Sequence, residues 1–452
     1  MAYSNYVSTP EAIWFSALPY TWRATKMREL FSERNTKVSD KEYPALSVGK
    51  MGVVPQLETA VKTDNGDNRK LICKGDFAIN SRSDRKGSSG ISEYNGSSSL
   101  IITVLKPHHE LNGRFYHYLL RSHYFVEEFY RNGHGLVSDL WTTKWDEMRN
   151  IYIPVPPREE QDKIVRYLDW QVSRINKLIH GYQRQIKLFQ EKAQKLTCSA
   201  VLHGLDGNVA MKPSGIQNIE FIPEHWHVLQ NKRIFAERTE FSETGKETLL
   251  SVSKHYGVKP YYALDDKEQF ATIKPAESLV GYKKVMKNDV AMNIMRARNG
   301  SFGISEYDGI VSPAYAVFRP IIECNPRYMH YLLRTPHVIG IFESYSYGIA
   351  EHRRRLYAVD FLRLHLPVPP VKEQNEIVQY VETIQEETKK ITDKIQKEIE
   401  LLREYSTRLI SDVVTGQMDV RGIEIPEYTP EEDTEDIPDA EDAADEEVTE
   451  NE

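Results

Sequence analysis

The sequence predicts an α+β protein in which two similar globules are separated by two long helices that form an antiparallel coiled coil, with a pseudo-twofold internal repeat. Two observations predict this fold class. Short segments recur along the 452 residues at a fixed spacing of 213. After each copy of the motif Pro-x-Pro-Pro-x-x-Glu-Gln, the apolar residues change to the regular spacing of a long helix.

Three segments define the repeat. They are Gly-Ile-Ser-Glu-Tyr at 90–94 and 303–307, His-Tyr-Leu-Leu-Arg at 117–121 and 330–334, and Pro-Val-Pro-Pro-x-x-Glu-Gln at 154–161 and 367–374. Nearer the N-terminus, Phe31 and Phe235 are only 204 residues apart, so we expect an insertion of about nine residues before Asp76 and Asp289. A duplicated chain presents two similar surfaces, which favours a ligand with two parts.

Each globule is predicted to contain short strands and a short amphipathic helix. The runs at 100–105 and 314–318 are rich in apolar and β-branched residues and are bounded by turn signals. The helix is expected around Tyr118 in the first copy and around Tyr331 in the second. We expect each globule to be an α+β domain of roughly 150 residues.

Two long helices follow the globules. Apolar residues recur in steps of three and four over 164–200 and 377–413, a period typical of helices packed along a seam. Proline suits the first helical turn, and Glu160 and Glu373 place negative charge at the positive end of the helix dipole. Each helix would be ~60 Å long. That length favours pairing of the two helices over the alternative, in which each folds back on its own globule.

The charge is unevenly distributed. The net charge is −8, but the 14 carboxylates from Glu427 onward are accompanied by no Lys or Arg. The remainder has 58 basic against 52 acidic residues, which is compatible with a polyanionic ligand. The tail composition predicts disorder. Two interpretations of the tail stay open: it solubilises the protein, or it competes with nucleic acid for the basic surface.

Several classes of protein are excluded. No apolar run approaches the ~18 residues that span a bilayer, and no signal peptide is visible. Cys73, Cys198 and Cys324 lack the spacing of a metal site or a disulfide framework, which fits a reducing cytoplasm. No phosphate-binding loop, dinucleotide fingerprint or Asn/Asp-Pro-Pro-aromatic run is present. We therefore expect a soluble, cytoplasmic, non-catalytic chain in which Glu93 and Glu306 fix turn geometry.

The order of globule, motif, helix, globule, motif, helix closely resembles the specificity subunit of type I restriction–modification enzymes over about residues 10 to 421. Residues 211–216 and 222–226 also resemble the start of that family's second recognition domain. The resemblance implies two target recognition domains, each reading one half of a bipartite double-stranded DNA site. It also implies a coiled coil that docks modification subunits. The acidic tail has no counterpart in the family pattern.

The resemblance further implies a division of labour. This chain would direct adenine methylation and restriction by two modification (methyltransferase) subunits and by motor–nuclease restriction subunits. It would hold no cofactor itself, since S-adenosylmethionine, ATP and Mg belong to those partners. The expected domains are a first target recognition domain (1–157), a first spacer helix (158–205), a second recognition domain (206–370), a second spacer helix (371–421) and an acidic disordered tail (422–452).

Comparison of the two copies gives candidate DNA-binding residues. Two halves that read different sequences should share phosphate contacts and differ where they read bases. Arg85 and Arg298 are shared and are expected to contact phosphate, whereas Lys86 lies opposite Asn299 and is a candidate for specificity. A second divergent stretch sets 141–144 against 353–355. The predicted DNA-binding residues are Arg82, Arg85, Lys86, Ser88, Lys144, Arg296, Arg298, Asn299, Ser301, Arg353, Arg354 and Arg355.

The two motifs are expected to start the spacer helices and to help dock partner subunits. Their residues are Pro156, Pro157, Glu160, Gln161, Pro369, Pro370, Glu373 and Gln374. Two modules on a rigid spacer should contact half-sites about one helical turn (~10 bp) apart, leaving roughly six to eight unread base pairs. Two alternatives stay open. One is a subunit that serves methylation only, and the other is a duplicated coiled-coil scaffold that binds protein without reading DNA.

Overall fold

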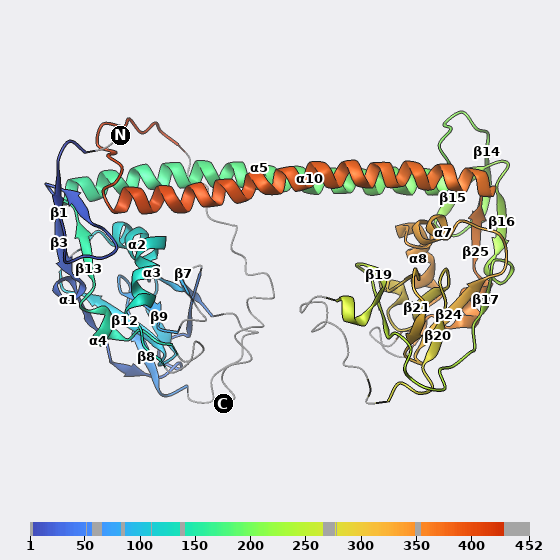
Figure 1. The fold of residues 1–452 in the computed structure, drawn as a ribbon, viewed down its shortest axis with the longest axis horizontal. Coiled ribbons are helices and arrows are strands. Elements are labelled where there is room, and N and C mark those ends of the chain that lie inside the picture. The colour runs from blue at the N-terminus through green and yellow to red at the C-terminus, as the bar shows by residue number, and fades with distance from the viewer. Residues whose placement is uncertain are drawn as a thin grey trace. The chain divides into compact units, whose positions relative to one another are not determined.

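The structure, a computed structural model, describes residues 3–50, 52–56, 66–82, 86–109, 111–135, 141–264, 276, 278–348 and 354–428. The chain divides into two compact units. The first unit is Met1–Gln185 with Ile395–Glu452, and the second unit is Ile186–Lys394. Each unit contains one globule and a part of each of the two long helices (Figure 1). Most of the predicted acidic tail, residues 429–452, lies outside the described residues.

The first globule is built from short antiparallel strands and four helices. The strands are β1 (Tyr6–Ser8), β2 (Ala17–Pro19), β3 (Arg23–Lys26), β4 (Phe31–Glu33), β5 (Lys37–Val38), β6 (Leu46–Gly49), β7 (Gly52–Pro55), β8 (Arg69–Ile72), β9 (Phe77–Asn80), β10 (Ser89–Ile91), β11 (Gly96–Ser98), β12 (Ile102–Pro107) and β13 (Tyr152–Val155). The helices are α1 (Met27–Leu30), α2 (Gly113–Arg121), α3 (His123–Arg131) and α4 (Trp145–Met148). The main sheet has the order β10-β9-β12-β4.

The second globule repeats this plan. Its strands are β14 (Met211–Ile216), β15 (Ile219–Pro223), β16 (His227–Gln230), β17 (Phe235–Glu237), β18 (Leu250–Ser253), β19 (Gly257–Pro260), β20 (Lys283–Val285), β21 (Val290–Asn293), β22 (Phe302–Ile304), β23 (Gly309–Val311), β24 (Tyr315–Pro320) and β25 (His365–Val368). Its helical elements are η3 (Asn231–Arg233), η4 (Tyr261–Ala263), η5 (Ala297–Asn299), α7 (Pro326–Leu333), α8 (Pro336–Ser344) and α9 (Ala358–Arg363). The main sheet, β22-β21-β24-β17, has the order of its counterpart.

Most of the insertion predicted from the two offsets lies between two matched strands. The offset is 204 between Leu46 and Leu250, 205 between Val53 and Val258, and 213 between Ile72 and Val285, so one residue is added in the β18–β19 turn and eight between β19 and β20. The apolar cores beside the sheets also correspond. Leu46, Val48, Val53, Ile72, Ala78 and Val104 of the first copy match Leu250, Val252, Val258, Val285, Ala291 and Val317 of the second. The internal repeat is therefore a repeat of structure.

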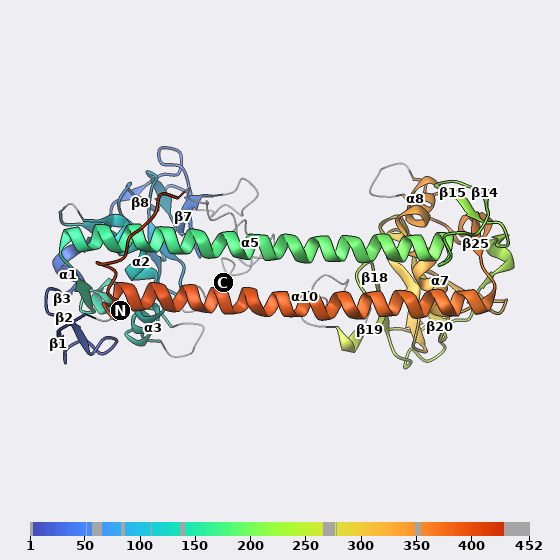
Figure 2. The ribbon, with the colours of Figure 1, turned by 90° about the horizontal axis from the view of Figure 1, so that it is seen from above.

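The two long helices are α5 (Arg158–His203, 46 residues) and α10 (Val371–Val414, 44 residues). Within each unit their segments lie side by side and run in opposite directions (Figures 1 and 2). In the first unit, Ile164, Leu168 and Ile175 of α5 are buried, as are Ile399 and Leu409 of α10. This arrangement confirms the predicted fold class, and the pairing of the helices is the outcome expected from the seam.

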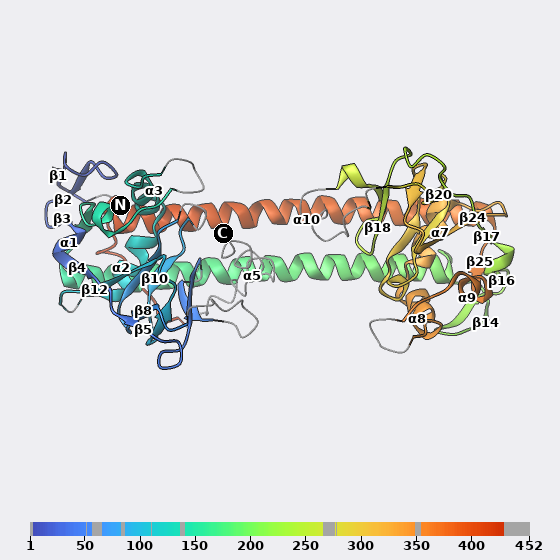
Figure 3. The same ribbon diagram turned by 90° about the horizontal axis from the view of Figure 1, so that it is seen from below.

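In each unit a short helix lies between the sheet and the long helices. Helix α2 does so in the first unit and α7 in the second (Figures 1 and 3). These are the amphipathic helices predicted around Tyr118 and Tyr331. Asn112 caps α2 by accepting from the Phe115 amide, and Asn325 caps α7 in the same way.

Candidate nucleic-acid interface

Two matched loops carry many of the predicted DNA-binding residues. Residues 81–88 join β9 to β10, and residues 294–301 join β21 to β22. The side-chain oxygen of Asn80 accepts from the Arg82 amide at 3.1 Å, and that of Asn293 accepts from the Met295 amide at 3.0 Å. An asparagine therefore starts each loop with the same side-chain-to-backbone turn.

The loops also end alike. Gly87 and Gly300 have φ values of +83° and +84°, which favours glycine because a Cβ atom strains that conformation. The next residues, Ser88 and Ser301, are only 6% and 5% exposed, and their carbonyls accept from the amides of Asn80 and Asn293. Because both serines are buried, they shape the loops, and the exposed residues remain as candidate DNA contacts.

A second segment lies against each loop. The backbones of His134 and Thr142 form an isolated antiparallel β-bridge in the first unit. Tyr347 and Arg355, each 213 residues further along the chain, form the same bridge in the second unit. The amide of Thr143 donates to the carbonyl of Ser81 at 3.0 Å. At the matching place in the second unit, the amide of Leu356 donates to the carbonyl of Ile294 at 2.9 Å. The structure therefore brings the two divergent stretches together in each unit.

This pairing corrects the register of the second stretch. Thr142 corresponds to Arg355 and Trp141 to Arg354, so the alignment of 141–144 against 353–355 was displaced by one residue. Lys144 consequently lies opposite Tyr357, which is not basic. The 213-residue offset of the repeats on both sides of this segment gives the same register.

The predicted contact residues differ in accessibility. Lys144, Arg296, Asn299 and Arg355 are exposed, whereas Arg82, Arg298 and Arg354 are half-buried. Arg85 and Arg353 lie outside the described residues, as does Ser83, the counterpart of Arg296.

Lys86 is already engaged within the first unit. Its ammonium forms an ion pair with Glu127 and lies 5.6 Å from the centre of the Tyr130 ring. At the matching positions of the second unit, Lys86 is replaced by Asn299 and Glu127 by Gly340. The two loops therefore present different groups on the same backbone frame.

A buried ion pair supports each sheet beside the loops. Arg34 Nε lies 2.7 Å from Asp76 Oδ2, and Arg238 Nε lies 2.6 Å from Asp289 Oδ2. A second nitrogen of each guanidinium contacts the other carboxylate oxygen, so both pairs are bidentate. The two carboxylates are 2% and 1% exposed. The two arginines are 204 residues apart and the two aspartates 213, so the offsets of the repeat together identify both pairs.

A histidine of each short helix binds the strand that follows the candidate loop. His117 Nδ1 accepts from the Ile91 amide at 3.4 Å, and His330 Nδ1 accepts from the Ile304 amide at 3.3 Å. Burial, together with the neighbouring Arg121 and Arg334, lowers the pKa of His117 to about 3 and that of His330 to about 4. Both imidazoles are therefore neutral near pH 7.

Arg334 reaches the recognition loop directly. Its guanidinium donates to the carbonyl of Phe302 at 2.9 Å and to that of Gly300 at 3.3 Å. It also donates to the carbonyl of Lys254 in the β18–β19 turn. In the first unit, Arg121 donates to the equivalent carbonyl of Lys50. In the second unit these contacts tie the candidate DNA-binding loop to α7 and to the β18–β19 turn.

The Ser-Glu-Tyr segments form matched turns, but the expectation that Glu93 and Glu306 fix their geometry is wrong. Ser92 Oγ donates to the carbonyl of Tyr94 at 2.8 Å, and Ser305 Oγ donates to that of Tyr307 at 2.7 Å. The carboxylate of Glu93 pairs with Lys74 at 3.1 Å, and that of Glu306 pairs with Arg327 at 3.4 Å. The serine hydroxyls, not the carboxylates, define the turns.

The motif glutamines bind the start of their own helices. Gln161 Nε2 donates to the carbonyl of Pro156, and Gln374 Nε2 donates to that of Pro369, both at 2.9 Å. Both glutamines and both of these prolines are buried. The following prolines, Pro157 and Pro370, are exposed.

The motif glutamates also have partners within the chain, but different ones. Glu160 accepts from the hydroxyl of Tyr3. Glu373 accepts from Trp226 Nε1 at 3.1 Å and contacts His225 Nε2 at 2.8 Å. With these side chains occupied, docking of partner subunits through the motifs stays a prediction for the exposed prolines.

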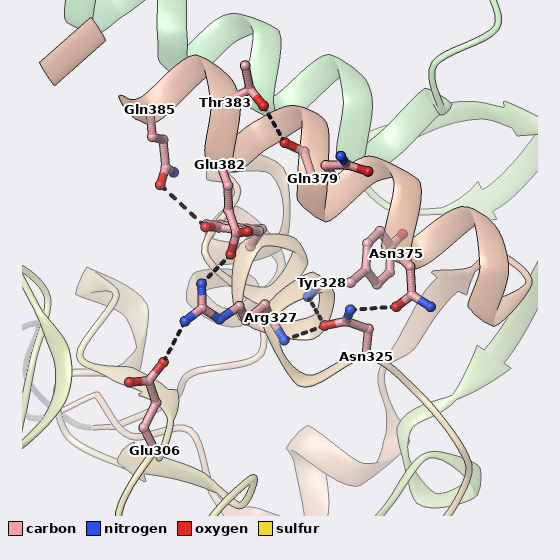
Figure 4. A network of polar contacts seen from close by, with 10 residues as sticks. Glu306, Asn325, Arg327, Tyr328, Asn375, Gln379, Glu382, Thr383 and Gln385 are labelled. Carbon is pink, nitrogen blue, oxygen red and sulfur yellow. Dashed lines mark hydrogen bonds and ion pairs between the residues drawn. The ribbon is translucent and has the colours of Figure 1, made fainter. Parts of the chain in front are cut away.

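A polar network joins the second globule to α10 (Figure 4). The Arg327 guanidinium contacts both Glu382 of α10 and Glu306 of the Ser-Glu-Tyr turn. Asn325 Nδ2 donates to Asn375 Oδ1 at 2.7 Å. In the first unit the equivalent network joins Arg114 to Asp169 of α5 at 3.0 Å. Each globule is thereby fixed to the helix that follows it.

Among the described residues, no three or more His, Cys, Asp or Glu side chains are grouped so as to hold a metal ion. No helix in the described part of the chain combines the length and apolarity needed to cross a membrane.

The comparison with protein families matches the model of the type I restriction modification DNA specificity domain twice, over residues 19–188 and 223–401. None of the curated proteins compared with the chain matches it. Among solved structures, a chain from work on complex assembly and conformational transition of the type I restriction–modification system is similar in fold. It has a TM-score of 0.58 and 14% identity over 89% of this chain and 99% of that one.

Two further solved chains are similar at lower scores. The HsdS subunit from Thermoanaerobacter tengcongensis has a TM-score of 0.44 and 16% identity, covering 89% of this chain and 98% of that one. The type I restriction–modification S subunit from M. genitalium has a TM-score of 0.31 and 13% identity, covering 87% and 96%.

Proposed function

This chain belongs to the family of type I restriction–modification DNA specificity proteins, and we propose that its two globules are target recognition domains that each read one half of a bipartite DNA site. The chain is a DNA specificity subunit by its family. We further propose which of its residues read DNA, which partner subunits it serves and how its two globules divide the DNA site.

One observation carries the proposal. The loops 81–88 and 294–301 have the same starting turn, the same left-handed glycine and the same buried serine, yet differ in their outward side chains. Lys86 opposite Asn299 is the clearest described example. A shared frame with different side chains is what two readers of different sequences require, because phosphate contacts position a protein and base contacts specify the sequence.

Among the candidate residues, Arg298 is proposed to contact phosphate, and Arg296, Asn299 and Arg355 to contribute to the second half-site. Lys144, Arg82 and Arg354 are further candidates. We propose recognition domains over 1–157 and 206–370 and an acidic tail over 422–452. The spacer helices expected over 158–205 and 371–421 end earlier, at His203 and Val414.

The partners proposed are two modification subunits and, for restriction, motor–nuclease subunits. This chain would itself be non-catalytic, and the S-adenosylmethionine, ATP and Mg would be bound by those partners in the cytoplasm. The fold similarity to a chain from a type I restriction–modification complex supports a place in such an assembly. The exposed faces of α5 and α10 outside residues 174–184, with Pro157 and Pro370, are the proposed docking surface.

Mapping of adenine methylation in cells with and without this chain tests the function. The expected result is a methylated motif in two parts, separated by roughly six to eight unread base pairs, that disappears on deletion. A continuous motif, or no change on deletion, would contradict the proposal. The second outcome would favour the alternative of a scaffold that does not read DNA.

Exchange of single side chains between the loops tests the assignment of half-sites. In the complex with the modification subunits, Asn299→Lys gives the second loop the residue of the first. The expected result is a change in one half of the methylated motif while the other half is retained. Arg298→Ala is the matched control. It should weaken binding to all sequences and reduce the salt slope by about one, because it removes a phosphate contact.

A further inference from the structure

The last described residues of the chain run along α5. Arg421 lies 3.9 Å from Glu160, and the ammonium of Lys163 donates to the carbonyl of Ile423. Tyr428 is half-buried, and its pKa is raised by burial and by Asp169, with Arg114 acting in the opposite sense. The chain therefore passes α5 positions 160, 163 and 169 in turn, and it reaches the surface of the helix where the described residues end.

Beyond Asp169 the character of α5 changes. Residues 170–190 contain no Asp or Glu and four cations: Arg174, Lys177, Arg184 and Lys187. The first three belong to the first unit and are exposed. Spacings of three and seven residues place them on one face of the helix, away from the buried seam position Ile175. We call Arg174, Lys177 and Arg184 the basic face of α5.

The cations of the basic face are not engaged in ion pairs within the described part of the chain. None of its three cations forms an ion pair with a described residue, although Arg174 lies 5.1 Å from the centre of the Trp170 ring. Lys86 of the candidate recognition loop is different, because its charge is already paired with Glu127. The basic face therefore offers positive charge that no described carboxylate pairs, on the helix along which the last described residues run.

The segment that follows Tyr428 has the complementary charge. Residues 429–452 contain 13 carboxylates and no Lys or Arg. Twenty-four residues reach at most about 80 Å when extended. The basic face covers about 15 Å of helix from Arg174 to Arg184. Reach is therefore ample, and tethering gives the segment a high effective concentration at this surface.

We propose that the acidic segment 429–452 docks on the basic face of α5, and so occupies a surface to which the backbone of non-cognate DNA would otherwise bind. Non-specific binding is almost entirely electrostatic, whereas cognate binding also includes base contacts. A tethered polyanion consequently suppresses non-cognate binding more than cognate binding. The docking is inferred from the charges and the path of the chain alone. Its effect on DNA binding rests on the proposed function.

Zero-length carbodiimide cross-linking of the full-length chain tests the docking. Lys177 is the reporter because its ammonium is the cross-linkable group of the basic face. The expected product is an intramolecular bond between Lys177 and carboxylates of 429–452. Substitution of Arg174 and Arg184 by Gln retains the reporter and should reduce the yield several-fold. The matched control, Lys389→Gln with Lys397→Gln, removes two exposed cations of α10 and should leave the yield unchanged.

Two cross-linking results would overturn the docking. One is bonding of the segment to Lys86 or Lys144 in place of Lys177, which would place it on the recognition loops. The other is bonding only between separate chains, which would make the contact one between copies. Circular dichroism of each variant ensures that a lost cross-link does not reflect a lost helix.

A DNA-binding experiment tests the consequence in the complex with modification subunits. Replacement of the 13 carboxylates by amides should raise affinity for a non-cognate duplex by about tenfold per phosphate contact regained at 0.1 M salt, and by much less at higher salt. A tail of the same composition in shuffled order should behave like the natural one. In the background of R174Q and R184Q, the gain should be much smaller.

The outcomes separate the two ideas. If the amide variant leaves non-cognate binding unchanged while cognate DNA is still bound, the inference fails and the proposed function stands. If no duplex is bound preferentially, the proposed function fails, but Lys177 cross-links would still establish the docking. If shuffling abolishes the effect, the tail acts through a specific sequence and the electrostatic argument is wrong.

Discussion

The two units share a frame and differ in what they attach to it. Their main sheets have the same strand order, and the buried pairs Arg34–Asp76 and Arg238–Asp289 have nearly the same geometry. Their differences lie at the loop tips and at the helix ends. Duplication therefore preserved the contacts that hold a recognition module together, while contacts that face a ligand or the other segments of the chain diverged.

The largest test of the shared frame is removal of a buried carboxylate. Asp76→Ala and Asp289→Ala should each destabilise their own unit by about 3 kcal/mol, because each leaves a guanidinium without its bidentate partner. Amide hydrogen exchange measures the loss in each unit separately. The exposed carboxylate of Asp67 supplies a control that should change little. A large loss in one unit with almost none in the other would show that the two frames are not equivalent.

The tryptophans at the helix ends sharpen the difference. Trp226 Nε1 donates to the carboxylate of Glu373, whereas Trp22 Nε1 is buried with no hydrogen-bond partner among the described residues. Trp226→Phe should therefore cost about 2 kcal/mol more than Trp22→Phe, since a hydrogen bond to a charged group is lost only in the second unit. Both substitutions remove the same volume, so the difference between them isolates the N–H group. Equal losses in chemical unfolding would mean that Trp22 finds a partner.

The buried histidines predict a difference in acid sensitivity. Since His117 and His330 have pKa values lowered to about 3 and about 4, the folded state binds fewer protons than the unfolded state. Their contribution to stability is complete above about pH 6.5 and is lost as the pH falls, by up to about 1.4 kcal/mol per pH unit for each group. The loss should stop near pH 4 for His330 and continue to about pH 3 for His117.

Urea unfolding between pH 7 and pH 3 measures these windows. His330→Gln should flatten the dependence of the second unit down to about pH 4 only, and His117→Gln should flatten that of the first unit further. Stability that fell equally in wild type and variants would mean that groups other than these histidines dominate the acid limb.

Much of the fold followed from the sequence because the two copies align. The long helices, the α2 and α7 helices and the turns at Ser92 and Ser305 each left a local pattern, either periodic or repeated. A pattern that appears twice at one offset is hard to attribute to chance. The same comparison also located the candidate loops, since shared and divergent positions alternate within them.

Contacts between distant segments were not predictable in this way. Glu373 accepts a hydrogen bond from Trp226, which lies 147 residues away, whereas the matched Glu160 accepts one from Tyr3. Local periodicity predicts neither hydrogen bond, because each depends on which distant segments meet at the end of the long helix. The ion pair of Lys86 with Glu127 was not predicted for the same reason, and it bears on the proposal that Lys86 contacts DNA.

The smallest expected effect concerns the ion pair between Lys86 and Glu127. Asn299 is exposed and makes no side-chain hydrogen bond within the described residues, so Asn299→Ala should shift base preference at the second half-site by about 1 kcal/mol. The ammonium of Lys86 is already paired with Glu127 and lies over the Tyr130 ring. Lys86→Ala should therefore change preference at the first half-site by less than about 0.5 kcal/mol, the usual size of an exposed ion pair.

Competition binding against duplexes randomised at each half-site measures both preferences in the assembled complex. Glu127→Gln is the informative companion, because it releases Lys86 without removing it. If Lys86 reads a base once released, this variant should sharpen preference at the first half-site, and Lys86→Ala should then erase the gain. If neither variant changes the first half-site, base reading in that unit belongs to other residues. The divergence between Lys86 and Asn299 would then reflect packing against α3, and the two units would differ in how their loops are held as well as in what they read.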